Sequence, residues 1–439
     1  MKKWLWQVCQ VSILLLPVFP ALGELGLVIV MFAVWRDRWQ QIIENRFNYG
    51  WLALAGWMVV SCAIAHKPTE AWLGLANFLP FFALFVALRL VINSIERLVR
   101  VAWLLVLPAM LVVVLGMGQL YLGWQSPELV SQILGWELVA GGIPEGRMSG
   151  VFIYANFLAI YLVFTFILSL GLWLYYWQQT KPDKIIILGL TLALVLNSLG
   201  LLLANSRNSW LIVGLVCFGF ALYLGWYWLI AFFSATLAIV CGASFGSFPG
   251  QNYLRQIVPE YIWSRLADRD FSDRPIETLR ITQWQYVGSK IQERPLAGWG
   301  LRNYTPLYLE HSGYWFGHPH NLFLMLGLEI GVVATIFFCL LVGYLLAKTV
   351  YIWFVASPKD SLLVEQSRTS MLQQAQYKTT LRANRLIIFT YLMAFASCIV
   401  FNLFDVTIFD LRVNTVSWLI LAAIAGNSQL ASQSSQLNS

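Results

Sequence analysis

The chain has 439 residues, of which 59% are apolar and only 11% are charged, and its formal net charge is +7. Its mean hydropathy is +0.69. A soluble protein of this length needs far more polar surface, so the composition excludes a soluble enzyme or binding module and predicts an all-α, polytopic membrane protein.

Apolar runs long enough to cross a bilayer as helices predict a bundle of about twelve spans. The first two form a hairpin within residues 5–35, broken near Pro17, Pro20 and Gly23. A charged start and an apolar middle also fit a secretory signal peptide, but a second apolar run follows at once and favours the hairpin. The other spans are expected at 49–66, 70–92, 99–123, 149–177, 184–204, 209–224, 226–246, 319–349, 385–404 and 411–427.

These spans divide the chain into four parts. Residues 1–246 hold spans one to nine, and residues 319–427 hold spans ten to twelve. Between them lies a long connection, residues 247–318, which is polar in patches and aromatic. The tail, residues 428–439, is rich in Ser and Gln and is expected to be disordered.

Lys and Arg are distributed unequally between the short connections, which sets the expected orientation. The four in the short outer connections are Lys67, Arg147, Arg207 and Arg412. The sixteen on the expected cytoplasmic side are Lys2, Lys3, Arg36, Arg38, Arg46, Arg89, Arg97, Arg100, Lys181, Lys184, Lys348, Lys359, Arg368, Lys378, Arg382 and Arg385. Both termini are therefore expected in the cytoplasm, and the long connection is expected to face outward as a periplasmic loop.

The long loop contains a predicted amphipathic helix. Its apolar positions are Ile276, Trp284, Val287 and Ile291. Arg280 projects from the middle of the same face. Burying a guanidinium is unfavourable unless an anion or acceptors meet it, and its planar fork suits phosphate oxygens. Arg280 is thus a candidate anion ligand, with an internal ion pair to Glu277, Asp273 or another acid of the loop as the alternative.

Two further polar segments interrupt apolar sequence on the same outer side. "HPHN", residues 318–321, opens the tenth span, where Asn and Pro also suit a simple helix start. Below it, Gly327, Gly331 and Thr335 form a small-residue stripe that allows a neighbouring helix to approach closely. Ser206 and Arg207 lie between the seventh and eighth spans, where an arginine can also simply reach the lipid headgroups.

These segments resemble the O-antigen ligase and polymerase family of bacterial membrane glycosyltransferases. "HNLFLMLGLEIGVVA" is similar to the family signature of His, Asn, nine residues and Gly, which His320, Asn321 and Gly331 match. Ala334 departs from the Gly, Thr or Tyr that is usual three residues later.

Three other stretches add to the resemblance, which covers roughly residues 145–345. "NSRNSW" resembles the Ser-Arg turn of the family, and "LRITQWQYVGSKIQERPLAGWGLRNY" resembles its loop segment. "RMSGVFIYANFLAIYL" is similar to a further block, which Gly150, Asn156 and Ala159 match. Tyr154 and Ala155 stand where the family often has Pro.

The resemblance implies transfer of a glycan from a polyprenyl-diphosphate donor to a glycolipid or polysaccharide acceptor at the outer face of the plasma membrane. Membrane lipids are expected partners, and neither a nucleic acid nor a cofactor is expected. His320 would act as the base, while Arg207 and Arg280 would neutralise the diphosphate. Substrate-binding positions are expected at Arg147, Asn156, Ser206, Trp284, His318 and Asn321.

No metal site is expected. The aspartates Asp268, Asp270 and Asp273 alternate with Arg269 and Arg274, a pattern typical of a solvated, self-neutralising run.

Two rival functions remain open at this stage. A small-anion transporter of the bicarbonate type would bind its substrate near the bilayer midplane, where Glu329 is the candidate. A flippase for lipid-linked glycans would use the arginines but would not need a base at His320.

Overall fold

The computed structural model describes residues 2–179, 181–267, 275–366 and 371–436. Within these ranges the fold is all-helical, and β pairing is limited to an isolated bridge between Gly142 and Arg147. The aspartate-rich run at 268–273 lies outside the described residues.

The N-terminal part consists of twelve α-helices up to residue 245, with a 3-10 helix, Leu75–Asn77, between α5 and α6. In chain order they are α1 (Lys3–Leu15), α2 (Pro20–Asp37), α3 (Trp39–Glu44), α4 (Asn48–Ala63), α5 (Pro68–Gly74), α6 (Leu79–Val91), α7 (Ile95–Tyr121), α8 (Glu128–Leu134), α9 (Ala155–Trp177), α10 (Lys184–Ala204), α11 (Arg207–Leu224) and α12 (Tyr227–Phe245). As expected, α1 and α2 pack together as a hairpin. Their junction is tight, because a Cβ on Gly23 would lie 2.6 Å from the Leu16 Cα.

The remaining helices form the long connection and the C-terminal part. They are α13 (Gln251–Ile257), α14 (Glu260–Leu266), α15 (Arg280–Glu293), α16 (Tyr304–Ser312), α17 (Leu322–Ile330), α18 (Val332–Gln366), α19 (Met371–Phe401) and α20 (Leu411–Gln436). The last helix thus extends into the segment for which a disordered tail is expected, and residues 437–439 lie outside the described range.

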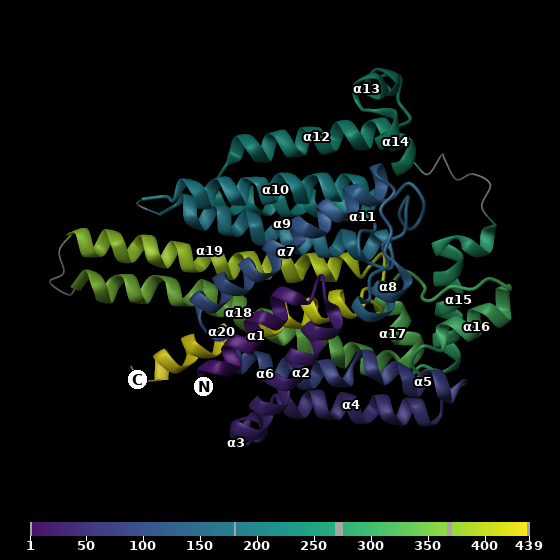
Figure 1. The fold of residues 1–439 in the computed structure, drawn as a ribbon, viewed down its shortest axis with the longest axis horizontal. Coiled ribbons are helices and arrows are strands. Elements are labelled where there is room, and N and C mark those ends of the chain that lie inside the picture. Colours follow the sequence, from purple (N-terminus) through teal and green to yellow (C-terminus); the bar gives the residue numbers. More distant parts are fainter. Residues whose placement is uncertain (1, 180, 268–274, 367–370, 437–439) are drawn as a thin grey trace.

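The long helices run side by side along one axis of the molecule (Figure 1). Within the described residues, eight helical stretches are long and apolar enough to cross a membrane. The protein is therefore a multi-pass membrane protein built as a helical bundle. Among these stretches α9 is the most buried, and it packs against α7, α10 and α19.

The short helices of the long connection gather at one end of the bundle. In Figure 1, α15 and α16 lie at the end away from the two chain termini. The starts of α9, α11 and α17 lie toward this same end.

Two expectations about local structure are wrong. Arg280 does not lie in the middle of an apolar helix face, because α15 begins at Arg280 and Ile276 lies in a separate, exposed 3-10 turn. The tenth span is not continuous either, because Gly331 adopts φ +83° and separates α17 from α18. A left-handed glycine of this kind ends a helix readily, and any other residue there is strained.

Candidate functional site

The site is built where the start of α17 meets the connection between α19 and α20. Asn321 caps α17 by accepting a hydrogen bond from the Leu324 amide at 2.9 Å. Its Nδ2 donates to the Leu403 carbonyl at 3.0 Å, and the Leu322 amide donates to the Asn402 carbonyl at 2.9 Å. The cap predicted from the sequence is confirmed, and it also fixes the two segments to each other.

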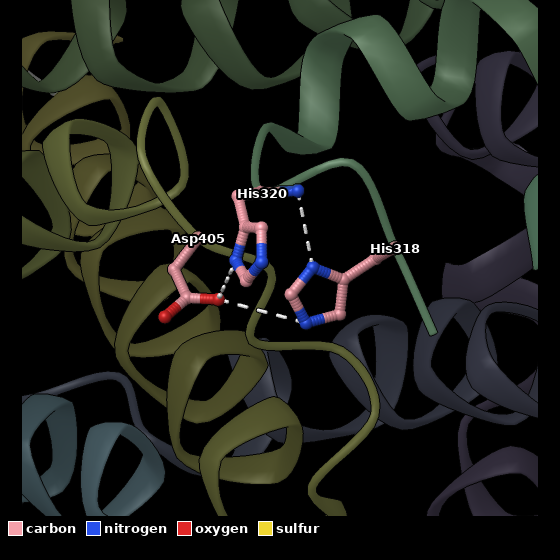
Figure 2. Close-up of side chains that lie close together, drawn as sticks. All are labelled: His318, His320 and Asp405. Carbon is pink, nitrogen blue, oxygen red and sulfur yellow. Dashed lines mark hydrogen bonds and ion pairs between the residues drawn. The ribbon is translucent and has the colours of Figure 1, made fainter. Parts of the chain in front are cut away.

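Two imidazoles share one carboxylate oxygen at this junction (Figure 2). His318 Nε2 lies 3.6 Å and His320 Nδ1 lies 3.5 Å from Asp405 Oδ1. These are ion-pair distances, longer than hydrogen bonds of good geometry. Catalytic contacts are often loose without substrate, so this spacing suits a base and its orienting carboxylate.

The backbone of His320 is held in an unusual conformation. Its φ is +55°, which is uncommon outside glycine. Its amide N–H donates to His318 Nδ1 at 3.2 Å, so that nitrogen carries a lone pair and the proton of neutral His318 is on Nε2. Burial lowers the pKa of His318 to about 4, which keeps the ring neutral at pH 7.

The same three side chains are close enough to be considered as metal ligands. Their ligand atoms all lie within 4.8 Å of one another. However, the proton of His318 is on Nε2, the nitrogen that faces Asp405. A metal at this position would need a lone pair on Nε2 and an N–H on Nδ1. The arrangement therefore suits proton handling better than metal binding.

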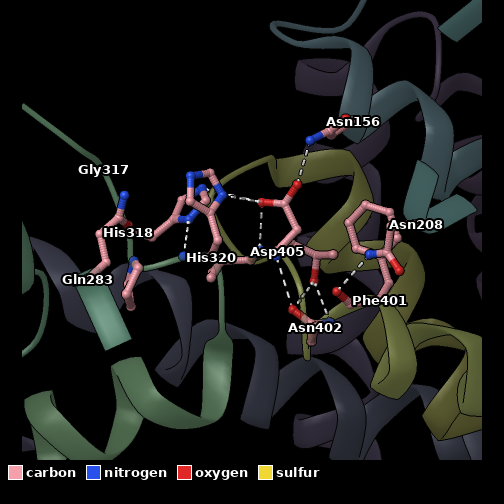
Figure 3. A network of polar contacts seen from close by, with 12 residues as sticks. Asn156, Asn208, Gln283, Gly317, His318, His320, Phe401, Asn402 and Asp405 are labelled. Carbon is pink, nitrogen blue, oxygen red and sulfur yellow. Dashed lines mark hydrogen bonds and ion pairs between the residues drawn. The ribbon is translucent and has the colours of Figure 1, made fainter. Parts of the chain in front are cut away.

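The second oxygen of Asp405 starts a chain of polar contacts (Figure 3). Asn156 Nδ2, from the start of α9, donates to Asp405 Oδ2 at 2.6 Å. Arg147 Nη2 donates to Asn156 Oδ1 at 2.6 Å, and Arg147 Nε donates to the Ala204 carbonyl at the end of α10 at 2.9 Å. Burial raises the pKa of Asp405, but the neighbouring imidazoles, His320 foremost, outweigh it and hold the pKa at about 2.

Arg207 lies beside this junction. Asn205 ends α10 in the left-handed conformation, and the buried Ser206 stands at the N-cap of α11 without a side-chain cap bond. Asn208 Nδ2 donates to the Phe401 carbonyl, at the end of α19, at 3.1 Å. Half-buried Arg207 therefore begins α11 next to the connection that carries Asp405.

Arg280 approaches from the long connection. It is exposed at the start of α15. Its positive charge, like that of His320, adds to burial in lowering the pKa of His318, while the Asp405 carboxylate opposes this shift. Trp284, one turn later, donates through Nε1 to the Pro319 carbonyl at 2.8 Å and so ties α15 to the "HPHN" segment.

An apolar cavity lies beside the start of α17, the helix that follows the two imidazoles. Its volume is about 200 Å³, and it runs between α18, α19 and α20. Leu322, Asn402 and Thr407 line it near the site, while Val342 and Leu346 line it further along α18.

The structure thus gathers four of the residues expected from the sequence around one residue that sequence reasoning missed. His318, His320 and Asn156 contact Asp405 directly, and Arg147 does so through Asn156. The signal was present in "FNLFDVTIFD", where Asp405 and Asp410 interrupt apolar sequence between the last two spans. Both are buried, and ionisable residues in such positions are functional candidates by default.

Comparison with known proteins gives two matches. Residues 192–339 match the family model described as O-antigen ligase. A Rickettsia conorii (strain Malish 7) protein, provisionally named a polysaccharide ligase, is 30% identical over 102 residues. That alignment covers 21% of this chain and 24% of the Rickettsia protein. The family match includes Arg207, Arg280 and His320 and ends before Asp405.

Proposed function

The chain belongs to an O-antigen ligase-like family, and on that premise we propose that it is a membrane glycosyltransferase. The donor is a glycan on a polyprenyl diphosphate, and the acceptor is a hydroxyl of a glycolipid or polysaccharide. The observation that carries this proposal is the His320–Asp405 pair. Arg207 begins α11 beside this pair, and Trp284 ties α15, the helix that Arg280 begins, to the same segment.

The reaction is a displacement at the sugar carbon that bears the diphosphate. The acceptor oxygen forms a bond to this carbon while the bond to the diphosphate oxygen breaks, and the electron pair leaves with the diphosphate. His320 accepts the acceptor proton, and Asp405 orients the ring and stabilises its positive charge. Arg207 and Arg280 stabilise the negative charge of the leaving diphosphate, so no metal is required.

The apolar cavity supports a lipid-linked donor. A diphosphate is bonded directly to its isoprenoid, so the chain must enter the bilayer right beneath the reacting group. Leu322, two residues after His320, lines the cavity, and the atoms that line it are almost entirely apolar. An acceptor glycolipid has less need of such a cavity, because its reacting hydroxyl can lie several sugars away from its acyl chains.

We place the protein in the plasma membrane of the cell, with the site facing the periplasm and both termini in the cytoplasm. This orientation follows from the excess of Lys and Arg on the opposite side. The segment 247–318 is then a periplasmic loop, between the spans of residues 1–246 and those of 319–427.

Purified protein in lipid nanodiscs tests the proposal. It should transfer radiolabelled glycan from a polyprenyl-diphosphate donor to a glycolipid acceptor and release polyprenyl diphosphate in equal amount. Absence of transfer, together with bicarbonate uptake by proteoliposomes, would favour the small-anion transporter. Movement of the intact donor between leaflets without product would favour the flippase.

A further inference from the structure

The contacts of Asn156 and Arg147 give these two residues a role different from substrate binding. We infer that they are positioning residues, which act on His320 through Asp405 and hold the base in place. The inference rests on the proposed function, because it takes His320 as the base.

The orientation of the Asn156 amide is determined by its two neighbours. Nδ2 faces the Asp405 carboxylate and Oδ1 faces the Arg147 guanidinium, each at 2.6 Å. A flipped amide would set oxygen against oxygen and N–H against N–H, so only one orientation satisfies both partners. Asn156 is thus a bridge between a cation and an anion that do not need to touch.

This bridge supplies the donor that one carboxylate oxygen needs. Asp405 is 6% exposed, and its Oδ1 is already occupied by the Val406 amide at 3.0 Å and by the two imidazoles. Oδ2 accepts the hydrogen bond from Asn156 Nδ2. Without this donor the carboxylate is held through Oδ1 alone, and the imidazole of His320 faces a less firmly fixed partner.

Arg147 anchors the bridge to a rigid element. Its Nε donates to the carbonyl of Ala204, the last residue of α10, and the Met148 amide donates to the Leu203 carbonyl at 2.9 Å. Both contacts lie directly before the turn that carries Arg207. The contact between Asn156 and Asp405 in Figure 3 thus continues, through Arg147, to Ala204, which lies three residues before Arg207, the arginine proposed to bind diphosphate.

The test is a double-mutant cycle between Asn156→Ala and Asp405→Asn, measured as glycan transfer by the full-length protein in nanodiscs. Alone, Asn156→Ala should lower kcat by about 10²-fold, because it misplaces the base, and should leave KM for the donor within about twofold. In the Asp405→Asn background, Asn156→Ala should lower kcat by less than about threefold, because the carboxylate through which Asn156 acts is already absent.

Two further variants check this interpretation. Asn156→Asp keeps the side-chain shape and sets a second carboxylate against Asp405, so it should lower kcat at least as much as Asn156→Ala. Asn197→Ala removes a buried amide of α10 that bonds Thr165, remote from this chain of contacts, and kcat should stay within about twofold of wild type.

Three results would overturn the inference. A higher donor KM with unchanged kcat in Asn156→Ala would make Asn156 a substrate ligand. Losses that multiply in the double variant would show that Asn156 does not act through Asp405. Full activity of His320→Gln would show that His320 is not the base, and the proposed function would then fail together with this inference.

Discussion

At the scale of single residues, the local role of a side chain was easier to predict than its contacts with distant residues. The helix cap at Asn321 follows from local chemistry, and the structure has it. Asp405 was missed because its partners come from positions 85 and 249 residues away, as the separations of the His320 and Asn156 contacts show. Nothing in local spacing predicts such pairs, and only the burial of an acid among apolar residues signals them.

Arg207 offers a test at this scale. Arg207→Lys keeps the charge but loses the planar, two-pronged contact with phosphate oxygens, so transfer should fall at least about tenfold while membrane expression stays near normal. The measurement is initial transfer rate together with binding of polyprenyl diphosphate. Wild-type transfer in this variant would mean that Arg207 only contacts lipid headgroups.

At the scale of elements, the break between α17 and α18 explains the "PLAGWG" segment. The Trp299 and Gly300 amides donate to the Leu328 and Glu329 carbonyls at 2.9 and 2.8 Å, and the Val332 amide donates to the Pro295 carbonyl at 2.8 Å. The loop therefore satisfies backbone groups that the helix break leaves free. The sequence predicted a small-residue stripe here, but the residues that approach it include this loop as well as Ile291 of α15.

Gly331→Ala should disrupt this contact. A Cβ at Gly331 would lie 1.9 Å from the Leu296 carbonyl oxygen, and φ +83° is strained for alanine. We expect a loss of stability of at least about 1–3 kcal/mol, with reduced transfer because α15 and α17 no longer hold Arg280 and His320 together. Thermal unfolding in detergent measures it. Gly343→Ala is the matched control, since its Cβ would meet nothing within 4 Å.

The apolar cavity allows a second test at this scale. Gly343 of α18 lines it and has open space at its Cβ position, so Gly343→Trp can narrow it without a clash in the backbone. KM for a long-chain polyprenyl donor should rise about tenfold, while a farnesyl-length donor should be affected less. Gly189→Trp, on α10 and equally open, is the control. Equal kinetics for both tryptophan variants would place the isoprenoid elsewhere.

At the scale of the whole molecule, composition and hydropathy were sufficient for the class, and each expected span coincides with a helix or a pair of helices. Eight stretches of the described residues are long and apolar enough to cross a membrane, and α1, α2, α4 and α20 are not among them, so the expected number of about twelve spans is not confirmed. The meeting of distant segments at one site was harder to predict. It depends on how helices pack, and α9, α11, α17 and the connection before α20 meet only in the folded bundle.

The proposed base is the central claim, and His320→Gln tests it most directly. Gln keeps the approximate size of the side chain and some hydrogen bonding but cannot accept a proton near neutral pH. His311→Gln is the matched control, because His311 is exposed on α16 and stacks on Tyr286 outside the site. Both variants should fold, since Asn321 caps α17 and neither histidine belongs to that helix.

The decisive measurement is the transfer rate of wild type, His320→Gln and His311→Gln at saturating donor, with polyprenyl-diphosphate binding measured on the same samples. The account predicts that only His320→Gln loses transfer, by about 10² to 10⁴, while its binding of the diphosphate stays close to wild type because Arg207 and Arg280 remain. Wild-type transfer by His320→Gln, or a loss of diphosphate binding that accounts for the whole defect, would contradict it.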